Sequence, residues 1–256
     1  MTLSYDGTEY HGWQVQPNGT TIQELVQDKL KILLRYPVTV IGSGRTDSGV
    51  HALEQTTNFK TLEPINSYRF LHSLNGLLPP DIRVHTLSLV PDEFHSQYSA
   101  IGKIYHYHLH LDRIHNPFTR RYRLHVREKI DLALLKQAAQ LFVGTKDFTS
   151  FANEAHSGSA ARDPIRCLSR LDVIDQEGGV RLEFEADGFL YKMVRNIVGM
   201  LLDISSGRRQ PHEIPLIFEA RDRRQAGMAA PPHALFLVKV HYPEYYQNSE
   251  NVPPQR

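Results

Sequence analysis

The residues best suited to chemistry lie in one short stretch, residues 41–52, with the sequence IGSGRTDSGVHA. Its glycines can adopt positive φ and allow another backbone to approach closely. Arg45 and Asp47 stand two residues apart, so extended backbone points both side chains to one side. A carboxylate between glycines is accessible to a flat ring, and carboxylates act as nucleophiles at sugar carbons. The alternative interpretation is a tight surface turn that holds an Arg–Asp pair.

The stretch does not match two familiar kinds of site. It has no Gly-Lys-Ser/Thr ending and no GxGxxG spacing that opens a helix, so it is not a phosphate-binding loop. No second carboxylate of equal standing lies near Asp47, whereas a glycoside hydrolase uses two. We therefore take Asp47 as a candidate nucleophile.

Two further side chains are candidates for a site. Arg195 lies in the segment MVRNIVG, residues 193–199, on a helix of mostly apolar residues. A guanidinium there needs an anionic partner unless its stem lets the charge reach the rim of the helix. Tyr105 shares a strand face with Tyr107 and Leu109, and this period favours core packing. At a strand end, a tyrosine can instead stack on a base.

The opposite face of that strand carries three histidines, His106, His108 and His110. Zinc accepts histidine nitrogen, so a metal site is one interpretation. Side chains at i and i+4 of a straight strand are about 13 Å apart, however, which is too far for one metal ion. We expect a solvated or RNA-facing surface instead.

Hydrophobic periodicity predicts two halves with a similar order of elements. In the first half we expect strands at 1–5, 37–41, 55–59 and 83–90, and helices that begin after Thr21 and near Tyr68. In the second half we expect strands at 103–111, 165–174, 180–186 and 234–242, and helices at 132–143 and 190–206. The predicted fold class is α+β, with two similar lobes that each have a mainly antiparallel sheet and helices on one face. The predicted domains are residues 1–95 and 96–243, followed by a polar tail at 244–256 that we expect to be disordered.

Composition limits the environment and the partners. The single Cys167 excludes an intramolecular disulfide and a CxxC pair, which fits a reducing cytoplasm. No apolar run reaches the roughly 18 residues of a membrane span, so we expect a cytoplasmic protein without membrane contact. The formal net charge is only +1, but 20 of the 29 basic residues are arginine, which suits phosphate contacts. Basic clusters with tyrosines between them are typical of a groove that binds folded RNA. The clusters are Arg120, Arg121 and Arg123; Arg162 and Arg166; Arg208 and Arg209; and Arg221, Arg223 and Arg224.

Motifs along most of the chain resemble those of the TruA-type tRNA pseudouridine synthases. The strongest is GRTDSGVHA at residues 44–52. The others are YDG at 5–7 with GWQ at 12–14, LLPPDI at 77–82 with FH at 94–95, KxYxY at 103–107, DFTSF at 147–151 and MVRNIVG at 193–199. The resemblance covers roughly residues 1–243. Ser43, Ser48 and Asn58 depart from the family's usual alanine, alanine and histidine.

The resemblance implies the conversion of uridine to pseudouridine at positions 38–40 in the anticodon stem-loop of tRNA. It implies that Asp47 is the catalytic aspartate, that Tyr105 stacks on the flipped uracil and helps to remove the C5 proton, and that Arg195 pairs with the aspartate. We also assign Arg45 and His51 to substrate binding. The resemblance further implies a homodimer with a basic cleft between the lobes. It also implies that the enzyme acts on tRNA and not on DNA, and that it uses neither a cofactor nor a metal.

Two other classes of function stay open at this point. One is a non-catalytic RNA-binding module that uses the same residues. The other is a metal hydrolase built on the histidine strand. The first is our main alternative.

Overall fold

The computed structural model describes residues 1–153 and 163–247. The described chain divides into two compact units, the first formed by Met1–Ile101 with the chain from Phe236 onward, and the second by Gly102–Leu235. The tail predicted at 244–256 lies outside the described residues except for its start, which forms the short helix α6 (Glu244–Gln247). No helix in these described ranges is long and apolar enough to cross a bilayer.

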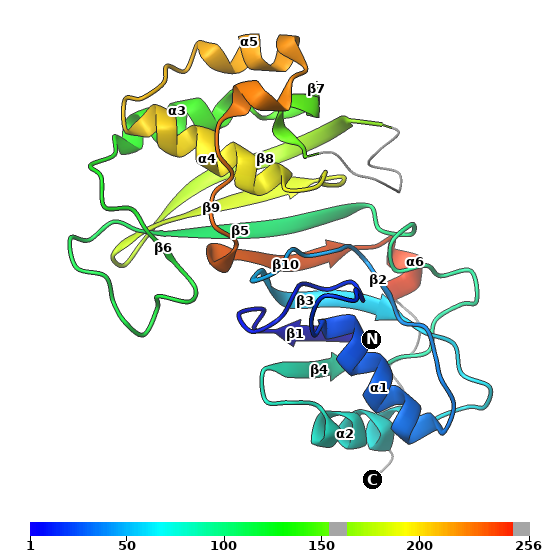
Figure 1. Cartoon of the computed structure of the whole chain (residues 1–256). Helices are drawn as coiled ribbons and strands as arrows, with labels where there is room; N and C mark the ends of the chain where they lie inside the picture. Colours follow the sequence, from blue (N-terminus) through cyan, green and yellow to red (C-terminus); the bar gives the residue numbers. More distant parts are fainter. Residues whose placement is uncertain (154–162, 248–256) are drawn as a thin grey trace. The chain divides into compact units, whose positions relative to one another are not determined.

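Besides α6, the described residues of unit 1 contain a mixed sheet and two longer helices (Figure 1). Its strands follow the order β4 (Ile82–Thr86), β1 (Thr2–Tyr5), β3 (His51–Asn58) and β10 (Leu235–His241). The β1 strand is antiparallel to both neighbours, whereas β10 runs parallel to β3. A two-residue strand, β2 (Ile41–Gly42), pairs with the far end of β3. The last strand of the chain therefore completes the sheet of the first unit.

Side chains cap the first turns of α1 and α2, and the cap of α1 at Thr21 was predicted from the sequence. In α1 (Ile22–Leu34), the Thr21 hydroxyl accepts a hydrogen bond from the Glu24 N–H, and the helix ends at Arg35 in the left-handed conformation. In α2 (Ser67–Leu77), the Asn66 side chain caps the Arg69 N–H. The two helices contact each other, and α2 also contacts β4. They supply the apolar side chains that cover this sheet.

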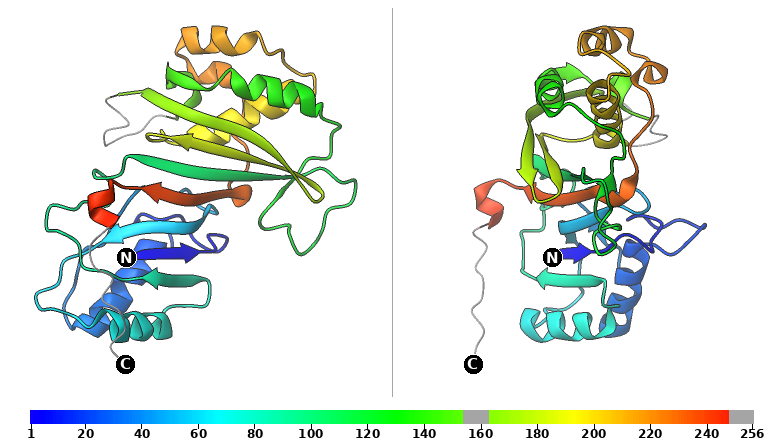
Figure 2. Two further views of the ribbon diagram at one scale, coloured as in Figure 1. Left: turned by 180° about the vertical axis from the view of Figure 1, so that it is seen from behind. Right: turned by 90° about the vertical axis from the view of Figure 1, so that its left-hand side faces the viewer.

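Unit 2 contains an antiparallel sheet in the order β5 (Gly102–His110), β9 (Gly179–Ala186), β8 (Ile165–Gln176) and β7 (Gly144–Asp147). A short strand, β6 (Leu124–His125), pairs with β5 in parallel. Figure 2 shows α3 (Leu132–Gln140) and α4 (Met193–Ser205) against this sheet, with α5 (Glu213–Ala220) on their outer side. The described residues of this unit also form the 3₁₀ turns η1 (Thr149–Phe151), η3 (Arg223–Ala226) and η4 (Pro232–Ala234). Alternation in β9 buries Val180, Leu182, Phe184 and Ala186 as predicted.

The α+β class with mostly antiparallel sheets is confirmed, but some elements differ from the sequence prediction. The strand predicted at 37–41 is reduced to β2, because side chains of α1 satisfy the backbone of Val40. Gln27 Oε1 accepts the Val40 N–H at 2.9 Å, and Gln23 Nε2 donates to the Val40 carbonyl at 2.7 Å. The strand expected at 55–59 begins earlier, at His51. Helix α5 and strand β7 were not predicted.

Candidate active site

The loop that carries Asp47 connects β2 to β3 and is held by hydrogen bonds to the segment after β1. The Trp13 N–H donates to the Thr46 carbonyl at 3.1 Å, and the Tyr5 and Thr46 hydroxyls lie 2.8 Å apart. On the other side of Asp47, the Gly49 N–H and the Ser48 hydroxyl both donate to the Tyr10 carbonyl, at 3.3 and 3.1 Å. Asp47 is thus fixed from both sides along the backbone.

Close backbone packing beneath this loop requires glycine at two positions. Gly12 has φ +89°, and a Cβ there would lie 2.5 Å from the Thr46 carbonyl oxygen. A Cβ on Gly42 would lie 2.5 Å from Nε1 of Trp13, which is itself 1% exposed. The GWQ motif at residues 12–14 contains both Gly12 and Trp13. The structure shows that this motif supports the loop.

Two buried polar side chains, Ser43 and Gln55, stabilise the start of the Asp47 loop through hydrogen bonds. The Ser43 hydroxyl donates to Gln55 Oε1 at 2.6 Å, and Gln55 Nε2 donates to the Gly44 carbonyl at 2.8 Å. Both side chains are fully buried. Buried polar groups are stable when they are hydrogen-bonded in this way, so the serine at position 43 has a structural partner.

The side chains of the loop alternate in exposure. Thr46 is buried, Arg45 is exposed and Asp47 is half-buried. This pattern directs Thr46 inward and leaves Arg45 and Asp47 at least partly exposed to solvent.

His51 lies in the interior of unit 1. It is 1% exposed, its Nδ1 accepts the Gly7 N–H at 3.0 Å, and this same nitrogen lies 3.1 Å from Asp6 Oδ1. Its ring stacks on Phe236 of β10 with centroids 4.6 Å apart. These contacts join the end of the loop to β10, while the predicted contact of His51 with substrate stays a prediction.

Tyr105 and Arg195 belong to unit 2. Tyr105 faces Phe184 across the β5–β9 ladder, packs edge-on against Phe189 at 4.9 Å, and is 8% exposed. Arg195 lies in the first turn of α4, where its Nε donates to the Ala230 carbonyl at 2.7 Å. The Ala230 N–H donates back to the Arg195 carbonyl at 2.9 Å.

The segment around Ala230 connects these two parts of unit 2. Tyr107, two residues after Tyr105 in β5, donates its hydroxyl to the Pro231 carbonyl at 2.8 Å, and burial raises the pKa of this hydroxyl. Gly199 of α4 lies so close that a Cβ there would be 1.9 Å from the Met228 carbonyl oxygen. The structure therefore groups Arg45, Asp47 and His51 in unit 1, and Tyr105 and Arg195 in unit 2.

Several arginines of the predicted basic clusters are engaged in ion pairs. Arg208 pairs with Asp203 and Glu128, and Arg209 pairs with Glu213. In the next cluster, Arg221 pairs with Asp147 at 3.0 Å, and Arg224 pairs with Asp222 at 2.8 Å. Such pairs reduce the positive charge available to RNA. Arg162 lies outside the described residues.

The histidines of β5 alternate with Tyr105, Tyr107 and Leu109 along the strand and differ in burial. His106 lies 3.7 Å from Glu183, and its ring centroid is 6.2 Å from that of His108. His110 is buried instead, with its ring 5.3 Å from that of His115 and 5.5 Å from that of His125. Within residues 1–153 and 163–247, no group of three or more His, Cys, Asp or Glu side chains has an arrangement that could hold a metal ion. The metal hydrolase alternative gains no support.

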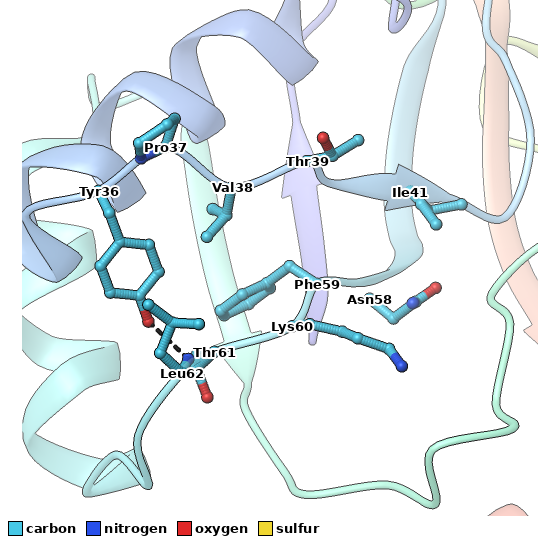
Figure 3. A pocket seen from close by; sticks show the side chains of 10 residues that line it. All are labelled: Tyr36, Pro37, Val38, Thr39, Ile41, Asn58, Phe59, Lys60, Thr61 and Leu62. Atoms are coloured by element: carbon cyan, nitrogen blue, oxygen red, sulfur yellow. Dashed lines mark hydrogen bonds between the residues drawn. The ribbon is translucent and has the colours of Figure 1, made fainter.

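A cavity of about 550 Å³ lies elsewhere in unit 1 (Figure 3). Residues 36–39, 41 and 58–62 line it, and the Tyr36 hydroxyl accepts the Leu62 N–H at 2.8 Å across one end. Its lining includes none of the predicted site residues.

Comparison with known proteins identifies the family. The sequence model of the tRNA pseudouridine synthase family matches residues 1–99 and 138–243. The chain is 57% identical to tRNA pseudouridine synthase A 1 of Protochlamydia amoebophila over 243 residues, which cover 94% of this chain and 95% of that protein. It is 40% identical to tRNA pseudouridine synthase A of an Exiguobacterium species (94% and 96% covered) and to that of Acetivibrio thermocellus (94% and 98% covered). With the Asp47 loop and its supports in place, these matches show that the chain belongs to the tRNA pseudouridine synthase family.

Proposed function

We propose that this protein isomerises uridine to pseudouridine at positions 38–40 in the anticodon stem-loop of tRNA, with Asp47 as the nucleophile. The observation that carries the proposal is the Asp47 loop, which is hydrogen-bonded on both sides and leaves Asp47 half-buried at its surface. Family membership and relatives named tRNA pseudouridine synthase A support the reaction and the substrate class. The positions in tRNA rest on the resemblance of the motifs.

The proposed reaction rearranges one glycosidic bond. The target base first leaves its stack, which costs a few kcal/mol and favours loops and stem ends. The Asp47 carboxylate then attacks, with C6 of uracil and C1′ of ribose as the two alternative targets. In both routes the N1–C1′ bond breaks, the uracil rotates, a C5–C1′ bond forms, and the bond between the carboxylate and its target carbon breaks to regenerate Asp47. The C5 proton leaves and N1 gains a proton, so the reaction is redox-neutral.

The other predicted site residues have separate roles in this proposal. The Tyr105 ring stacks on the flipped uracil, and its hydroxyl helps to remove the C5 proton. Arg195 pairs with the Asp47 carboxylate through a charge-assisted interaction. Arg45 and His51 contribute to substrate binding. We further propose that the protein acts in the cytoplasm as a homodimer, without cofactor or metal.

The test uses an unmodified tRNA transcript that carries tritium at C5 of its uridines, with a chelator present. A C5 glycosidic bond forms only with release of that tritium, so we expect release by the wild-type protein. Asp47→Asn removes the charge but keeps the shape, and we expect it to abolish release while tRNA affinity is retained. A matched control is Asp175→Asn, which changes an exposed carboxylate in the β8–β9 hairpin.

The outcomes separate the classes of function. Release by Asp47→Asn at a comparable rate would refute the nucleophile assignment. Tight tRNA binding without release by the wild-type protein would favour the non-catalytic RNA-binding module. Mapping of the pseudouridines in the product tests positions 38–40 independently.

A further inference from the structure

The guanidinium of Arg223 points into unit 2, although the sequence groups it with a basic cluster. Its Nη2 donates to Asn196 Oδ1 at 2.7 Å, its Nη1 to the Gly227 carbonyl at 2.7 Å and its Nε to Asn153 Oδ1 at 3.3 Å. All three partners are neutral. Its neighbours in the cluster pair with carboxylates instead. An arginine whose three nitrogens each have an internal acceptor is poorly placed to bind a phosphate.

One of these partners, Asn196, follows Arg195 directly in the first turn of α4. Asn196 is fully buried, and its Nδ2 donates to the Phe151 carbonyl at 2.8 Å and to Asn153 Oδ1 at 3.1 Å. Its Oδ1 accepts the Arg223 guanidinium. The side chain is thus hydrogen-bonded through both its oxygen and its nitrogen, and it fixes the start of α4 against η1 and η3.

The second partner, Gly227, begins the segment that binds Arg195 from the other side. Gly227 has φ +74°, and its carbonyl accepts Nη1 of Arg223. The carbonyl of the next residue, Met228, lies in close contact with Gly199 of α4. Ala230 then forms two hydrogen bonds with Arg195, one through its N–H and one through its carbonyl. A single guanidinium therefore holds both pieces of backbone that determine where Arg195 lies.

We propose that Arg223 is a positioning residue for pseudouridine formation, which acts through Asn196 and Gly227 on the orientation of the Arg195 guanidinium. The inference rests on the proposed function, in which Arg195 pairs with the catalytic aspartate. This positioning role needs a planar guanidinium, because its three nitrogens donate to three separate acceptors. Lysine keeps the charge but presents one compact ammonium, so it cannot reproduce this geometry.

The experiment measures tritium release at saturating tRNA, together with the Kd for tRNA and the melting temperature. For Arg223→Lys we expect kcat to fall on the order of 10–100-fold, because small misplacements of catalytic groups have effects of this size. We expect the Kd for tRNA to stay within about twofold of wild type, since the guanidinium faces inward. The matched control is Gln225→Ala in the same 3₁₀ turn, which changes an exposed residue, and we expect it to keep wild-type kcat.

A double-mutant cycle distinguishes positioning from a general loss of stability. If Arg223 acts through Arg195, Arg223→Lys changes kcat by less than about twofold in the Arg195→Lys background. Multiplicative losses in the double variant would overturn the proposal. So would a weaker Kd with unchanged kcat, which is the result expected of a phosphate contact.

Two further outcomes are decisive. A lower melting temperature with unchanged kcat per folded molecule indicates a purely structural role and overturns the inference alone. Absence of tritium release by the wild-type protein overturns the proposed function, and the inference with it.

Discussion

Individual hydrogen bonds determine the position of Asp47. The carbonyls of Thr46 and Tyr10 accept from residues on opposite sides of the aspartate, so neither flank of the loop can shift alone. A nucleophile needs this constraint, because its reaction depends on close approach to one atom of the substrate. The close approach of Gly12 to the Thr46 carbonyl is part of this constraint.

We expect Gly12→Ala to reduce kcat strongly while much of the fold persists. Its φ of +89° is unfavourable for alanine, and the new Cβ would lie 2.5 Å from the Thr46 carbonyl oxygen, which displaces the loop. Tritium release and thermal unfolding measure the two effects. Gly76→Ala is the control, since nothing lies within 4 Å of its added Cβ in α2 and alanine favours helix by about 0.5–1 kcal/mol. Wild-type kcat in Gly12→Ala would contradict the role assigned to this glycine.

We expect Tyr105→Phe to slow the chemistry and leave binding intact. The phenyl ring keeps the edge-on contact with Phe189 and the proposed stacking surface, but it lacks the hydroxyl that we propose helps to remove the C5 proton. Single-turnover release then falls while the Kd for tRNA is unchanged. Tyr105→Leu removes the aromatic face as well and weakens binding in addition. Equal single-turnover rates in wild type and Tyr105→Phe would exclude the hydroxyl from catalysis.

Residue types and motifs predicted which groups in the chain are chemically distinctive, but not how each one is held. The inward position of Arg223 depends on Asn153 and Asn196, which are far from it in sequence. The burial of His51 depends likewise on Phe236. Periodicity describes one element at a time and cannot reveal contacts of this kind.

Strand β5 shows how one element places two kinds of side chain. Its inward face carries Tyr105, Tyr107 and Leu109, which are buried as the alternation predicts. His106 and His108 lie on the other face, beside charged residues of β9. Burial and the positive charges of His106, Arg123 and Arg181 lower the pKa of His108 to about 4.

The lowered pKa of His108 predicts that the stability of the protein depends on pH. In the unfolded chain His108 has a pKa of about 6.5, so between pH 6.5 and 4 the unfolded state binds the proton more readily than the folded state. The free energy of unfolding therefore falls as the pH drops through this window. We expect His108→Gln, which stays neutral, to show a smaller loss between pH 7 and pH 5 in urea titrations. Equal losses in wild type and variant would contradict the shifted pKa.

Elements with local signals were predictable, and those that depend on distant partners were not. Capping residues located the starts of α1 and α3, and alternation located β5 and β9. Helix α5 is short and contains Pro215, so its eight residues carry no clear period. The strand at the end of the chain was recognised, but its parallel pairing with β3 is a contact that no local pattern records.

At the scale of the whole molecule, the balance of charge limits where tRNA can bind. Much of the positive charge in unit 2 is paired with carboxylates, as at Arg208 and Arg221. Arg113 and Arg120 are exposed on the segment between β5 and β6, and neither forms an ion pair with a carboxylate in the described parts of the chain. We propose that this segment contributes phosphate contacts.

The salt dependence of tRNA binding tests this assignment. Each phosphate contact that is lost reduces the slope of log Kobs against log[salt] by roughly one. We expect Arg113→Gln and Arg120→Gln each to reduce the slope, whereas Arg208→Gln, whose partners are Asp203 and Glu128, leaves it unchanged. An unchanged slope in the first two variants would exclude the segment from the RNA contact.

The pairing of β10 with β3 has a consequence for how the protein is made. Phe236 packs on His51 at the end of the Asp47 loop, yet it is synthesised long after that loop has left the ribosome. Translation proceeds at roughly 5–20 residues per second. Many seconds therefore pass between synthesis of β3 and synthesis of β10, the strand that pairs with it. A prematurely terminated chain lacks this strand altogether. Assembly of the surroundings of Asp47 is thereby linked to the synthesis of residue 236, so that products shortened before this residue carry the glycine-rich motif without the contact from Phe236.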